Sequence, residues 1–190
     1  MKLIIASNNA HKIYEIKTIL GGKFDEILSL KEAGISHETV EDGSTFMENA
    51  YKKAREIAEL SGCAALADDS GICADALGGA PGIYSARFSG EHGNDKANND
   101  LLIEKLSDKA DKSAHYTAAI SLVYPDGKKV EAEGYMYGKI IDTPRGERGF
   151  GYDPIFVPDG EERTVAEMSD EEKNAISHRG AALRLLLSKL

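Results

Sequence analysis

Hydrophobic and polar residues follow two different periods along the chain, one typical of strands and one typical of helices. A short apolar run at residues 3–6 predicts a buried strand, and Ile13, Ile16 and Leu20 then recur at the helical spacing. The whole pattern predicts, in chain order, strand 3–6, helix 11–20, strand 26–30, helix 46–61, strand 64–67, extended residues 72–77, helix 94–106, strands 116–124 and 129–141, and helix 181–190. This mixture indicates an α/β protein with a mixed sheet.

Local signals mark several of these boundaries. Thr45-x-x-Glu48 and Ser169-x-x-Glu172 have the capping-box pattern that begins a helix. Pro125-Asp126-Gly127 joins two strand-like runs and predicts a hairpin. A stretch rich in glycine and proline, residues 143–160, is predicted to be a loop. Because no linker or repeat divides the chain, residues 1–190 are predicted to form one domain.

Composition narrows the class of protein. The chain has 190 residues, of which 42% are hydrophobic, so it has enough apolar material for a substantial core and is not a disordered chain. Its 23 Lys and Arg against 32 Asp and Glu give a formal net charge of −9. Surfaces that follow a nucleic-acid backbone are usually basic, so a nucleic-acid partner is not expected. A small anion could still bind where cations gather locally.

The expected cellular location follows from what the chain contains. No apolar run approaches the ~20 residues of a membrane-spanning helix, and Met1-Lys2 leads into the first strand without a signal-peptide pattern. Cys63 and Cys73 lack the C-x-x-C spacing of a metal or redox site and are interpreted as reduced thiols. We therefore expect a cytoplasmic protein with no membrane partner.

A polar cluster lies between the first predicted strand and helix. It comprises Ser7, Asn8, Asn9, Ala10, His11 and Lys12. Backbone N–H groups at a helix N-terminus, small polar side chains and the lysine together could hold a phosphate. An ordinary helix N-cap beside a solvated lysine is the competing interpretation, and it is favoured by the absence of the glycines of a Walker or Rossmann loop.

Two adjacent acids follow the strand predicted at residues 64–67. Asp68 and Asp69 repel each other unless a cation or a shared proton stabilises them, which indicates a magnesium site, a general base or both. Their expected place at a strand end, where α/β folds bind ligands, favours function over a solvated turn. Glu41, which precedes Asp42-Gly43, could supply a further metal ligand, although this segment taken alone is better explained as an ordinary turn.

A second set of candidates lies in the last third of the chain. Phe150, Gly151, Tyr152 and Asp153 combine aromatic residues and glycine in a loop on which a flat base could stack, although core packing of Phe150 is the alternative. Lys173, His178 and Arg179 carry donors suited to phosphate oxygens or a base carbonyl, although charge on a solvated helix surface is the simpler explanation.

Taken in order, these segments resemble the Ham1-type inosine/xanthosine triphosphate pyrophosphatases, which remove non-standard purine nucleotides. The resemblance extends from Leu3 to Arg179. The matching segments are Ser7-x-Asn9-x-x-Lys12, Thr45-Phe46-x-Glu48-Asn49-Ala50 with Lys53-Ala54, Ala67-Asp68-Asp69-Ser70-Gly71, Gly78-Gly79-x-Pro81-Gly82, Phe150-Gly151-Tyr152-Asp153-Pro154 and Ser177-His178-Arg179.

The resemblance implies a fold, a reaction and a set of roles. It implies a long twisted sheet flanked by helices, two lobes with a central substrate cleft, and a homodimer. The implied reaction is Mg²⁺-dependent attack of water on the α-phosphorus of ITP, dITP or XTP, which releases the monophosphate and pyrophosphate. By resemblance, Asp69 is the metal-linked catalytic acid, the sequence does not separate Asp68 from it, and Glu41 helps hold Mg²⁺. The resemblance further implies that the triphosphate is bound by Ser7, Asn9, Lys12 and Lys53. It implies that the nucleoside is bound by Ser70, Phe150, Gly151, Tyr152, Asp153, Lys173, His178 and Arg179.

One segment departs from the family pattern, and two other functions compete. Where the family has a Thr-Gly-Gly-type run before Phe150, this chain has Gly146-Glu147-Arg148-Gly149, so bulk is expected near the base loop. Donors that face the base should accept inosine and xanthosine, which carry a carbonyl at C6, and reject adenine. The competing functions are a Maf-type nucleotide pyrophosphatase and a nucleotide sensor without turnover.

Overall fold

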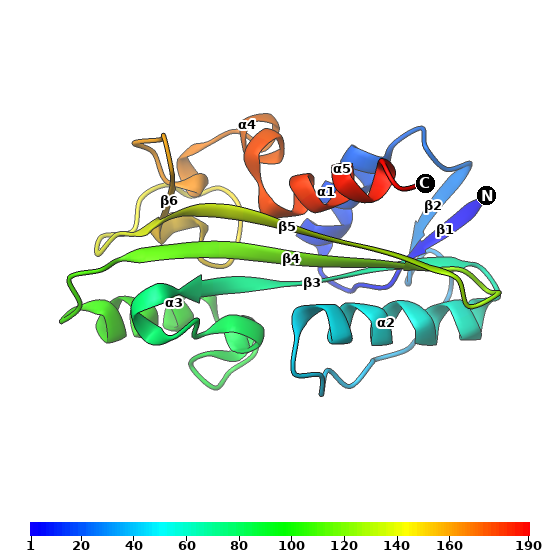
Figure 1. Cartoon of the computed structure of the whole chain (residues 1–190), viewed down its shortest axis with the longest axis horizontal. Helices are drawn as coiled ribbons and strands as arrows, with labels where there is room; N and C mark the ends of the chain where they lie inside the picture. The colour runs from blue at the N-terminus through cyan, green and yellow to red at the C-terminus, as the bar shows by residue number, and fades with distance from the viewer. The chain divides into compact units, whose positions relative to one another are not determined.

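The computed structural model describes all residues, Met1–Leu190, as an α/β fold around a six-stranded mixed sheet (Figure 1). The strand order is β2-β1-β3-β4-β5-β6; β1 is parallel to β2 and β3, and β5 is antiparallel to β6. The strands are β1 (Lys2–Ile5), β2 (Glu26–Ser29), β3 (Ala64–Ala74), β4 (Ser113–Val123), β5 (Lys129–Ile140) and β6 (Phe156–Pro158). The helices are α1 (Ala10–Leu20), α2 (Phe46–Ser61), α3 (Asp95–Leu106), α4 (Asp170–Ile176) and α5 (His178–Leu187). The predicted fold class, a long mixed sheet flanked by helices, is confirmed.

The chain divides into two compact units, each assembled from separate segments. Unit 1 comprises Met1–Asp69, Ala118–Gly134 and Arg179–Leu190, and unit 2 comprises Ser70–Thr117 and Tyr135–His178. The four unit boundaries fall within β3, β4, β5 and the first turn of α5 rather than in a linker. The single domain and the substrate cleft stay predictions.

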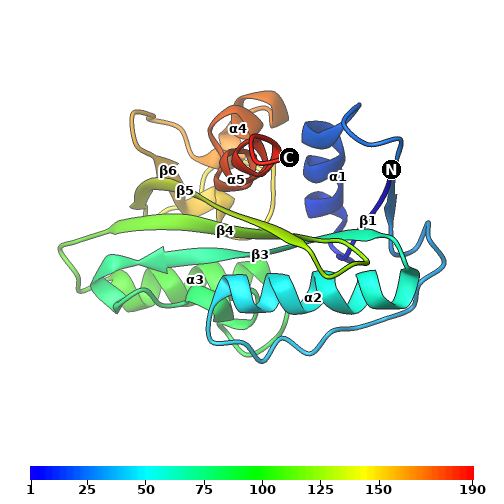
Figure 2. The same ribbon diagram turned by 45° about the vertical axis from the view of Figure 1, so that its right-hand side comes forward.

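Unit 1 has apolar side chains on both faces of its sheet. On one face, Leu3 and Leu66 of the strands pack with Ile16 of α1 and Leu183 of α5. On the other face, residues of α2 such as Ile57 pack against the alternate strand positions (Figure 2). Burying each large aliphatic side chain contributes about 1.5–3 kcal/mol. Because successive residues of a strand point to opposite faces, adjacent residues of β3 face different helices.

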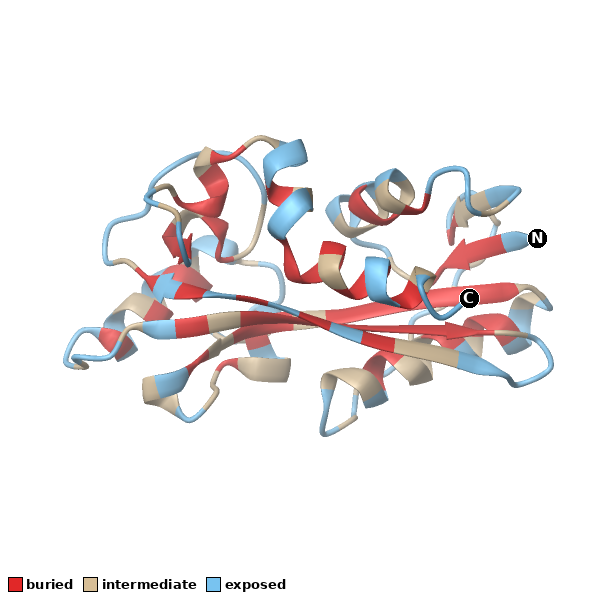
Figure 3. Ribbon diagram, turned by 45° about the horizontal axis from the view of Figure 1, so that its top comes forward, coloured by how far each residue is buried: buried red, intermediate tan, exposed pale blue.

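Unit 2 has one core, formed by α3, the strand segments and the loop that leads to β6. Leu102 and Leu106 of α3, Ile72 of β3, Tyr116 of β4 and Phe156 of β6 are among its buried members. Along β5, buried and exposed residues alternate, as the colouring of Figure 3 shows. This alternation is typical of a strand with one face on a core and the other toward solvent.

The structure corrects the predicted elements at three places. The strand predicted at 64–67 does not end before the acids but continues through Asp68-Asp69-Ser70-Gly71 to Ala74, so the acids lie within a strand rather than at its end. Residues Asp75–Leu77, expected to be extended, form a 3-10 helix. The loop predicted at 143–160 contains β6 and another 3-10 helix, Asp153–Ile155. The two capping boxes are confirmed.

No helix in the structure has the length and apolar character that crossing a membrane requires. The longest, α2, has 16 residues and carries lysine, arginine and glutamate along its length.

Candidate active site

Most of the predicted charged site residues lie in two clusters, one in each unit, together with neighbours that were not predicted. The cation–carboxylate cluster of unit 1 comprises Lys12, Glu15, Glu41, Asn49, Lys53, Asp68, Asp69 and Arg179. The aromatic–carboxylate cluster of unit 2 comprises Tyr116, Phe150, Asp153, Lys173 and His178.

Strand geometry separates the two adjacent acids, which the sequence could not do. Asp68 and Asp69 are successive residues of β3, so their side chains point to opposite faces of the sheet. Asp68 contacts Lys12 of α1 and Arg179 of α5, whereas Asp69 contacts Asn49 of α2. The two carboxylates therefore have different partners and different electrostatic surroundings.

Asp68 is held between two cations. Lys12 Nζ lies 2.6 Å from Oδ1, and Arg179 Nε donates to Oδ2 at 3.1 Å. Burial by itself would raise the pKa of Asp68, but the charges of Arg179 and Lys12 and their hydrogen bonds outweigh it and lower this pKa well below its usual range. A carboxylate held in this way stays ionised and is a poor proton acceptor near neutral pH.

Arg179 belongs to the same buried arrangement. Its side chain is 1% exposed, and its guanidinium also donates to Glu15 of α1. Burial opposes the charged form, but attraction by Asp68 and Glu15 raises the pKa of Arg179 further. The structure thus places Arg179 on two carboxylates of unit 1; a contact between Arg179 and a purine base stays a prediction.

Asp69 has the opposite character. Burial raises its pKa above the ordinary value, and the charge of Glu41 adds to this rise, whereas Lys53, Lys12 and the Asn49 hydrogen bond oppose it. Asn49 Nδ2 donates to Oδ2 at 3.0 Å, and Lys53 Nζ lies 3.9 Å from Oδ1. A carboxylate with a raised pKa accepts a proton more readily near neutral pH. Asp69 therefore fits the role of general base better than Asp68.

Lys53 connects Asp69 to the loop that carries Glu41. Its ammonium is 2.5 Å from Glu41 Oε1 and donates to the backbone oxygen of Asp68 at 2.9 Å. Asn49 and Lys53 are one turn apart on α2, so both point to the same side of the helix. The sequence shows this spacing, but it does not show which carboxylates the two residues contact.

The donor set of Glu41 and Asp69 suits magnesium. The structure contains no group of three or more His, Cys, Asp or Glu side chains arranged to hold a metal ion. Mg²⁺ is commonly bound through one or two carboxylates, with waters and substrate phosphates as the remaining ligands. Two carboxylates within 4 Å of one lysine ammonium form a place where positive charge is already favoured. These residues fit the ion, and the Mg²⁺ requirement stays a prediction.

The polar cluster at the start of α1 forms a helix N-cap, which was the alternative interpretation to a phosphate-binding site. Asn9 Oδ1 accepts hydrogen bonds from the N–H groups of His11 and Lys12, and Ser7 Oγ accepts one from the N–H of Asn9. Asn8, Ala10 and His11 are exposed. The helix end retains its partial positive charge, so the cap does not exclude an anion nearby.

Asp153 is the centre of the cluster in unit 2. Its Oδ1 accepts from the Tyr116 hydroxyl at 3.0 Å. Its Oδ2 accepts from Lys173 Nζ at 2.9 Å and from the Phe150 N–H at 3.0 Å. The Lys173 ammonium also lies 4.6 Å from the centroid of the Phe150 ring, a cation–π distance. One carboxylate thus orients both the aromatic loop and the buried lysine.

Tyr116 also supports His178, and sequence reasoning did not identify it as a site residue. The two rings stack with centroids 4.6 Å apart and planes 10° apart. Tyr116 lies in a predicted strand, and its sequence context shows only that an aromatic residue faces a core. Its pKa is raised well above the ordinary value, first by burial and then by the charge of Asp153, so it remains a neutral hydrogen-bond donor.

The remaining predicted residues of the base loop are fixed by backbone contacts. Gly151 donates its N–H to Asp95 Oδ2 at 2.7 Å, and its carbonyl accepts from Asn99 at 3.2 Å. The Tyr152 hydroxyl donates to the Ser85 carbonyl at 2.6 Å. Ser70 lies in β3 and is partly buried. Sequence reasoning missed Asp95 and Asn99, which look like ordinary surface residues of α3.

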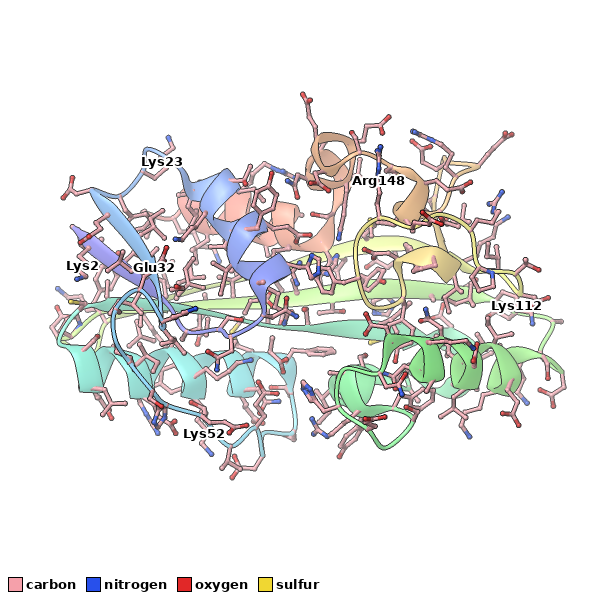
Figure 4. All side chains as sticks on the ribbon, turned by 180° about the vertical axis from the view of Figure 1, so that it is seen from behind. Lys2, Lys23, Glu32, Lys52, Lys112 and Arg148 are labelled. Carbon is pink, nitrogen blue, oxygen red and sulfur yellow. The ribbon has the colours of Figure 1, made fainter.

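The unusual segment before Phe150 does not strain the backbone. Gly146 and Gly149 have φ of +86° and +76°, and no residue other than glycine in the chain has a positive φ. A Cβ at Gly149 would lie 2.1 Å from Asp153 Oδ2, so glycine is required at that position. Arg148 needs no such conformation, and its side chain is exposed (Figure 4). The position that needs glycine is therefore still glycine.

Partly buried lysines beside carboxylates in one unit can pair with phosphate oxygens, and an aromatic ring beside a buried lysine in the other unit can stack with a base. Residues 3–189 match the model of the Ham1 family. The chain belongs to the Ham1 family.

Named relatives and solved structures agree with this membership. A dITP/XTP pyrophosphatase of Clostridium perfringens is 50% identical, over 100% of this chain and 97% of the relative. One from Streptomyces avermitilis is 48% identical, over 98% of this chain and 95% of the relative. The structure of the Staphylococcus aureus Ham1 protein has a TM-score of 0.89 at 40% identity, covering 100% of this chain and 97% of that chain. A HAM1 protein from Coxiella burnetii has a TM-score of 0.90 at 38% identity and covers both chains completely.

Proposed function

We propose that this protein hydrolyses non-standard purine nucleoside triphosphates, namely ITP, dITP and XTP, to the nucleoside monophosphate and pyrophosphate. The observation that carries the proposal is the division of roles between two adjacent acids. Lys12 and Arg179 balance the charge of Asp68 and lower its pKa, whereas burial, together with the charge of Glu41, raises the pKa of Asp69. The relatives from Streptomyces avermitilis and Clostridium perfringens are named dITP/XTP pyrophosphatases, which supports the same substrate class.

In the proposed reaction, Asp69 takes a proton from the water that attacks the α-phosphorus. Lys12 and Lys53 bind oxygens of the triphosphate and stabilise the charge that develops on the leaving pyrophosphate. Glu41 and Asp69 would hold Mg²⁺, which when bound neutralises triphosphate charge as a Lewis acid. Asp68 keeps Lys12 and Arg179 in place, because it pairs with both. The residues of unit 1 therefore supply the base and the cations of the reaction.

The cluster of unit 2 is proposed to bind the nucleoside end. The Phe150 ring offers a surface on which a purine can stack, worth about 1–3 kcal/mol per base. Lys173 and His178 carry donors that would pair with the C6 carbonyl of inosine or xanthosine and oppose the C6 amine of adenine. Asp153 keeps Lys173 and the loop in place through its hydrogen bonds. Guanine has the same carbonyl, and no residue in the structure accounts for its exclusion.

A panel of nucleoside triphosphates tests the proposed function. With Mg²⁺ present, we expect release of pyrophosphate from ITP, dITP and XTP, and kcat/KM lower by ~10⁴-fold for ATP, because a mismatched base leaves buried donors unpaired. The measurement is product identification by chromatography with a pyrophosphate assay. Tight binding of ITP without any product would instead establish a sensor, and turnover of other bases only would overturn the substrate class.

Replacing Lys173 with methionine tests the assignment of the nucleoside end. We expect kcat/KM for ITP to fall about 10–100-fold, because a charge-assisted hydrogen bond is worth about 1.5–3 kcal/mol. Inhibition by pyrophosphate, which has no base, should stay unchanged in steady-state assays. Lys96→Met, at an exposed lysine of α3, is the control. An equal loss of pyrophosphate affinity in Lys173→Met would place Lys173 on the phosphates instead.

The assembly is proposed on the resemblance, and the location and partners on the composition, the net charge and the lack of long apolar runs. We propose a homodimer in the cytoplasm, with a small-molecule nucleotide as the ligand and no nucleic-acid or membrane partner.

A further inference from the structure

Asn49 is buried and contacts both Asp69 and the loop that carries Glu41. It lies in the first turn of α2 and is 2% exposed. We propose that Asn49 is a positioning residue that orients the Asp69 carboxylate and fixes the approach of the loop that carries Glu41. This inference deepens the proposed function and rests on it for the roles of Glu41 and Asp69.

Both ends of the Asn49 amide are engaged. Nδ2 donates to Asp69 Oδ2 at 3.0 Å, and Oδ1 accepts from the backbone N–H of Gly43 at 2.8 Å. The Gly43 N–H can only donate, and an ionised carboxylate can only accept, so these partners allow a single orientation of the amide. A carboxylate or a hydrocarbon at this position could not make both bonds.

The helix end that carries Asn49 is itself fixed. Thr45 and Glu48 form a reciprocal capping box, and Glu48 also accepts from the N–H and the hydroxyl of Ser44. The backbone N–H of Asn49 donates to the Thr45 carbonyl at 3.2 Å. The amide therefore projects from a rigid turn, and Asp69 is held by a group that has little freedom to move.

Gly43 makes the close approach of the loop feasible. A Cβ at Gly43 would lie 2.6 Å from Asn49 Oδ1 and 2.9 Å from Glu48 Cβ. Any larger residue would push the loop away from α2 and from the Asn49 amide. Because Glu41 lies shortly before Gly43 on this loop, the contact between Gly43 and Asn49 also determines where Glu41 stands.

Asn49 thus fixes which Asp69 oxygen faces the other members of the cluster. Oδ2 is occupied by the amide, while Oδ1 lies on the side of the Lys53 ammonium. Without the amide donor, the Asp69 carboxylate can rotate, and its oxygens no longer have a fixed orientation relative to Glu41. Partners that orient metal ligands are typically worth 10–100-fold in metal affinity or activity.

The test compares two buried asparagines with the same hydrogen-bonding pattern. Asn98 of α3 is also 2% exposed; its Oδ1 accepts from the Ser89 N–H at 2.8 Å, and its Nδ2 donates to the Ala86 carbonyl at 3.3 Å. It contacts no carboxylate through these bonds. Asn49→Leu and Asn98→Leu therefore lose equivalent bonds, but only the first removes a donor from Asp69.

The probe is Mn²⁺, which takes the same oxygen ligands as Mg²⁺ and is measured by electron paramagnetic resonance on the protein without nucleotide. Asn49→Leu is expected to weaken Mn²⁺ binding about 10–100-fold and to lower kcat for ITP by a similar factor, with KM changed less. Asn98→Leu should keep both values. Gly43→Ala provides a second route, because it displaces the loop while Asn49 itself is retained.

The outcomes separate this inference from the proposed function. Equal Mn²⁺ affinity in Asn49→Leu, Asn98→Leu and the wild type would overturn the positioning role. If Asn49→Leu does not fold, Gly43→Ala decides: weaker Mn²⁺ binding supports the role, and unchanged binding overturns it. A wild type that binds Mn²⁺ but does not hydrolyse ITP would refute the proposed function, while the Mn²⁺ comparison would still test Asn49.

Discussion

Asp69→Asn should abolish turnover of ITP, with kcat lowered by at least ~10²–10⁴-fold. The substitution removes the group proposed to accept the proton of the attacking water, and a positioned general base contributes a factor of this size. The side chain keeps its shape and can still accept the hydrogen bond from Asn49 Nδ2. Nucleotide affinity should therefore change much less than kcat, as measured by calorimetry with ITP in the presence of Ca²⁺.

Asp69→Asn should also change the stability of the fold, and here the expected change is an increase. Burial raises the pKa of Asp69 in the folded protein, so its ionised form destabilises the fold at neutral pH relative to its protonated form. The neutral amide avoids this cost, and the melting temperature of Asp69→Asn at pH 7 should exceed that of the wild type. The difference should shrink as the pH falls through the raised pKa, because the wild-type carboxyl then becomes neutral too.

A control for both readouts lies in the same part of unit 1. Asp42 is exposed and pairs with Lys52 at the surface, 2.7 Å away. Asp42→Asn removes one carboxylate without touching Asp69 and should leave both turnover and melting temperature near the wild-type values. Turnover of Asp69→Asn at the level of this control would remove Asp69 from the mechanism.

The order of helices and strands could be predicted well from the sequence, because apolar periodicity reports which side of an element is buried. The course of β3 could not. Asp, Ser and Gly have low strand propensity, so Asp68-Asp69-Ser70-Gly71 resembles a turn. In the structure, Lys12, Arg179 and Asn49 stabilise the two acids inside the strand. Long-range partners outweigh local propensity at this position.

This error had a direct effect on the prediction of the site. With the strand ended at residue 67, nothing distinguished Asp68 from Asp69. In a continuous strand, the alternation of side chains places them on opposite faces. The different pKa directions then follow, because Lys12 of α1 and Arg179 of α5 outweigh burial at Asp68, whereas burial prevails at Asp69.

Residues whose role depends on distant partners were the hardest to identify. Glu15 is an acidic residue beside Ile16 in the first predicted helix, and its burial requires a cation. That cation is Arg179, which is 164 positions away in the chain. Asn49 lies in a segment that matches the Ham1-type family. Its partners, Gly43 and Asp69, could not be predicted, because they depend on how the loop folds back on α2.

Arg179→Met should lower the free energy of unfolding by about 3–5 kcal/mol, the usual cost of leaving a buried charge without its partner. Arg179 is 1% exposed and pairs with both Asp68 and Glu15. Methionine has a comparable volume, so the loss of stability comes mainly from Asp68 and Glu15, whose buried negative charges lose the guanidinium that balances them. Urea unfolding measures the change. Arg55→Met is the control, because Arg55 makes an exposed pair with Glu59 one turn away, worth about 0.3–0.5 kcal/mol.

Two further measurements connect this loss to the buried charges rather than to packing. Adding Glu15→Gln to Arg179→Met should recover part of the stability, because it neutralises one of the carboxylates that lost its partner. The difference between wild type and Arg179→Met should also shrink in acid. The lowered pKa of Asp68 keeps it ionised in the wild type, whereas without Arg179 this pKa rises and protonation removes the unpaired charge. A loss equal to that of Arg55→Met, or one independent of pH, would contradict the role of Arg179 as the counter-ion of Asp68.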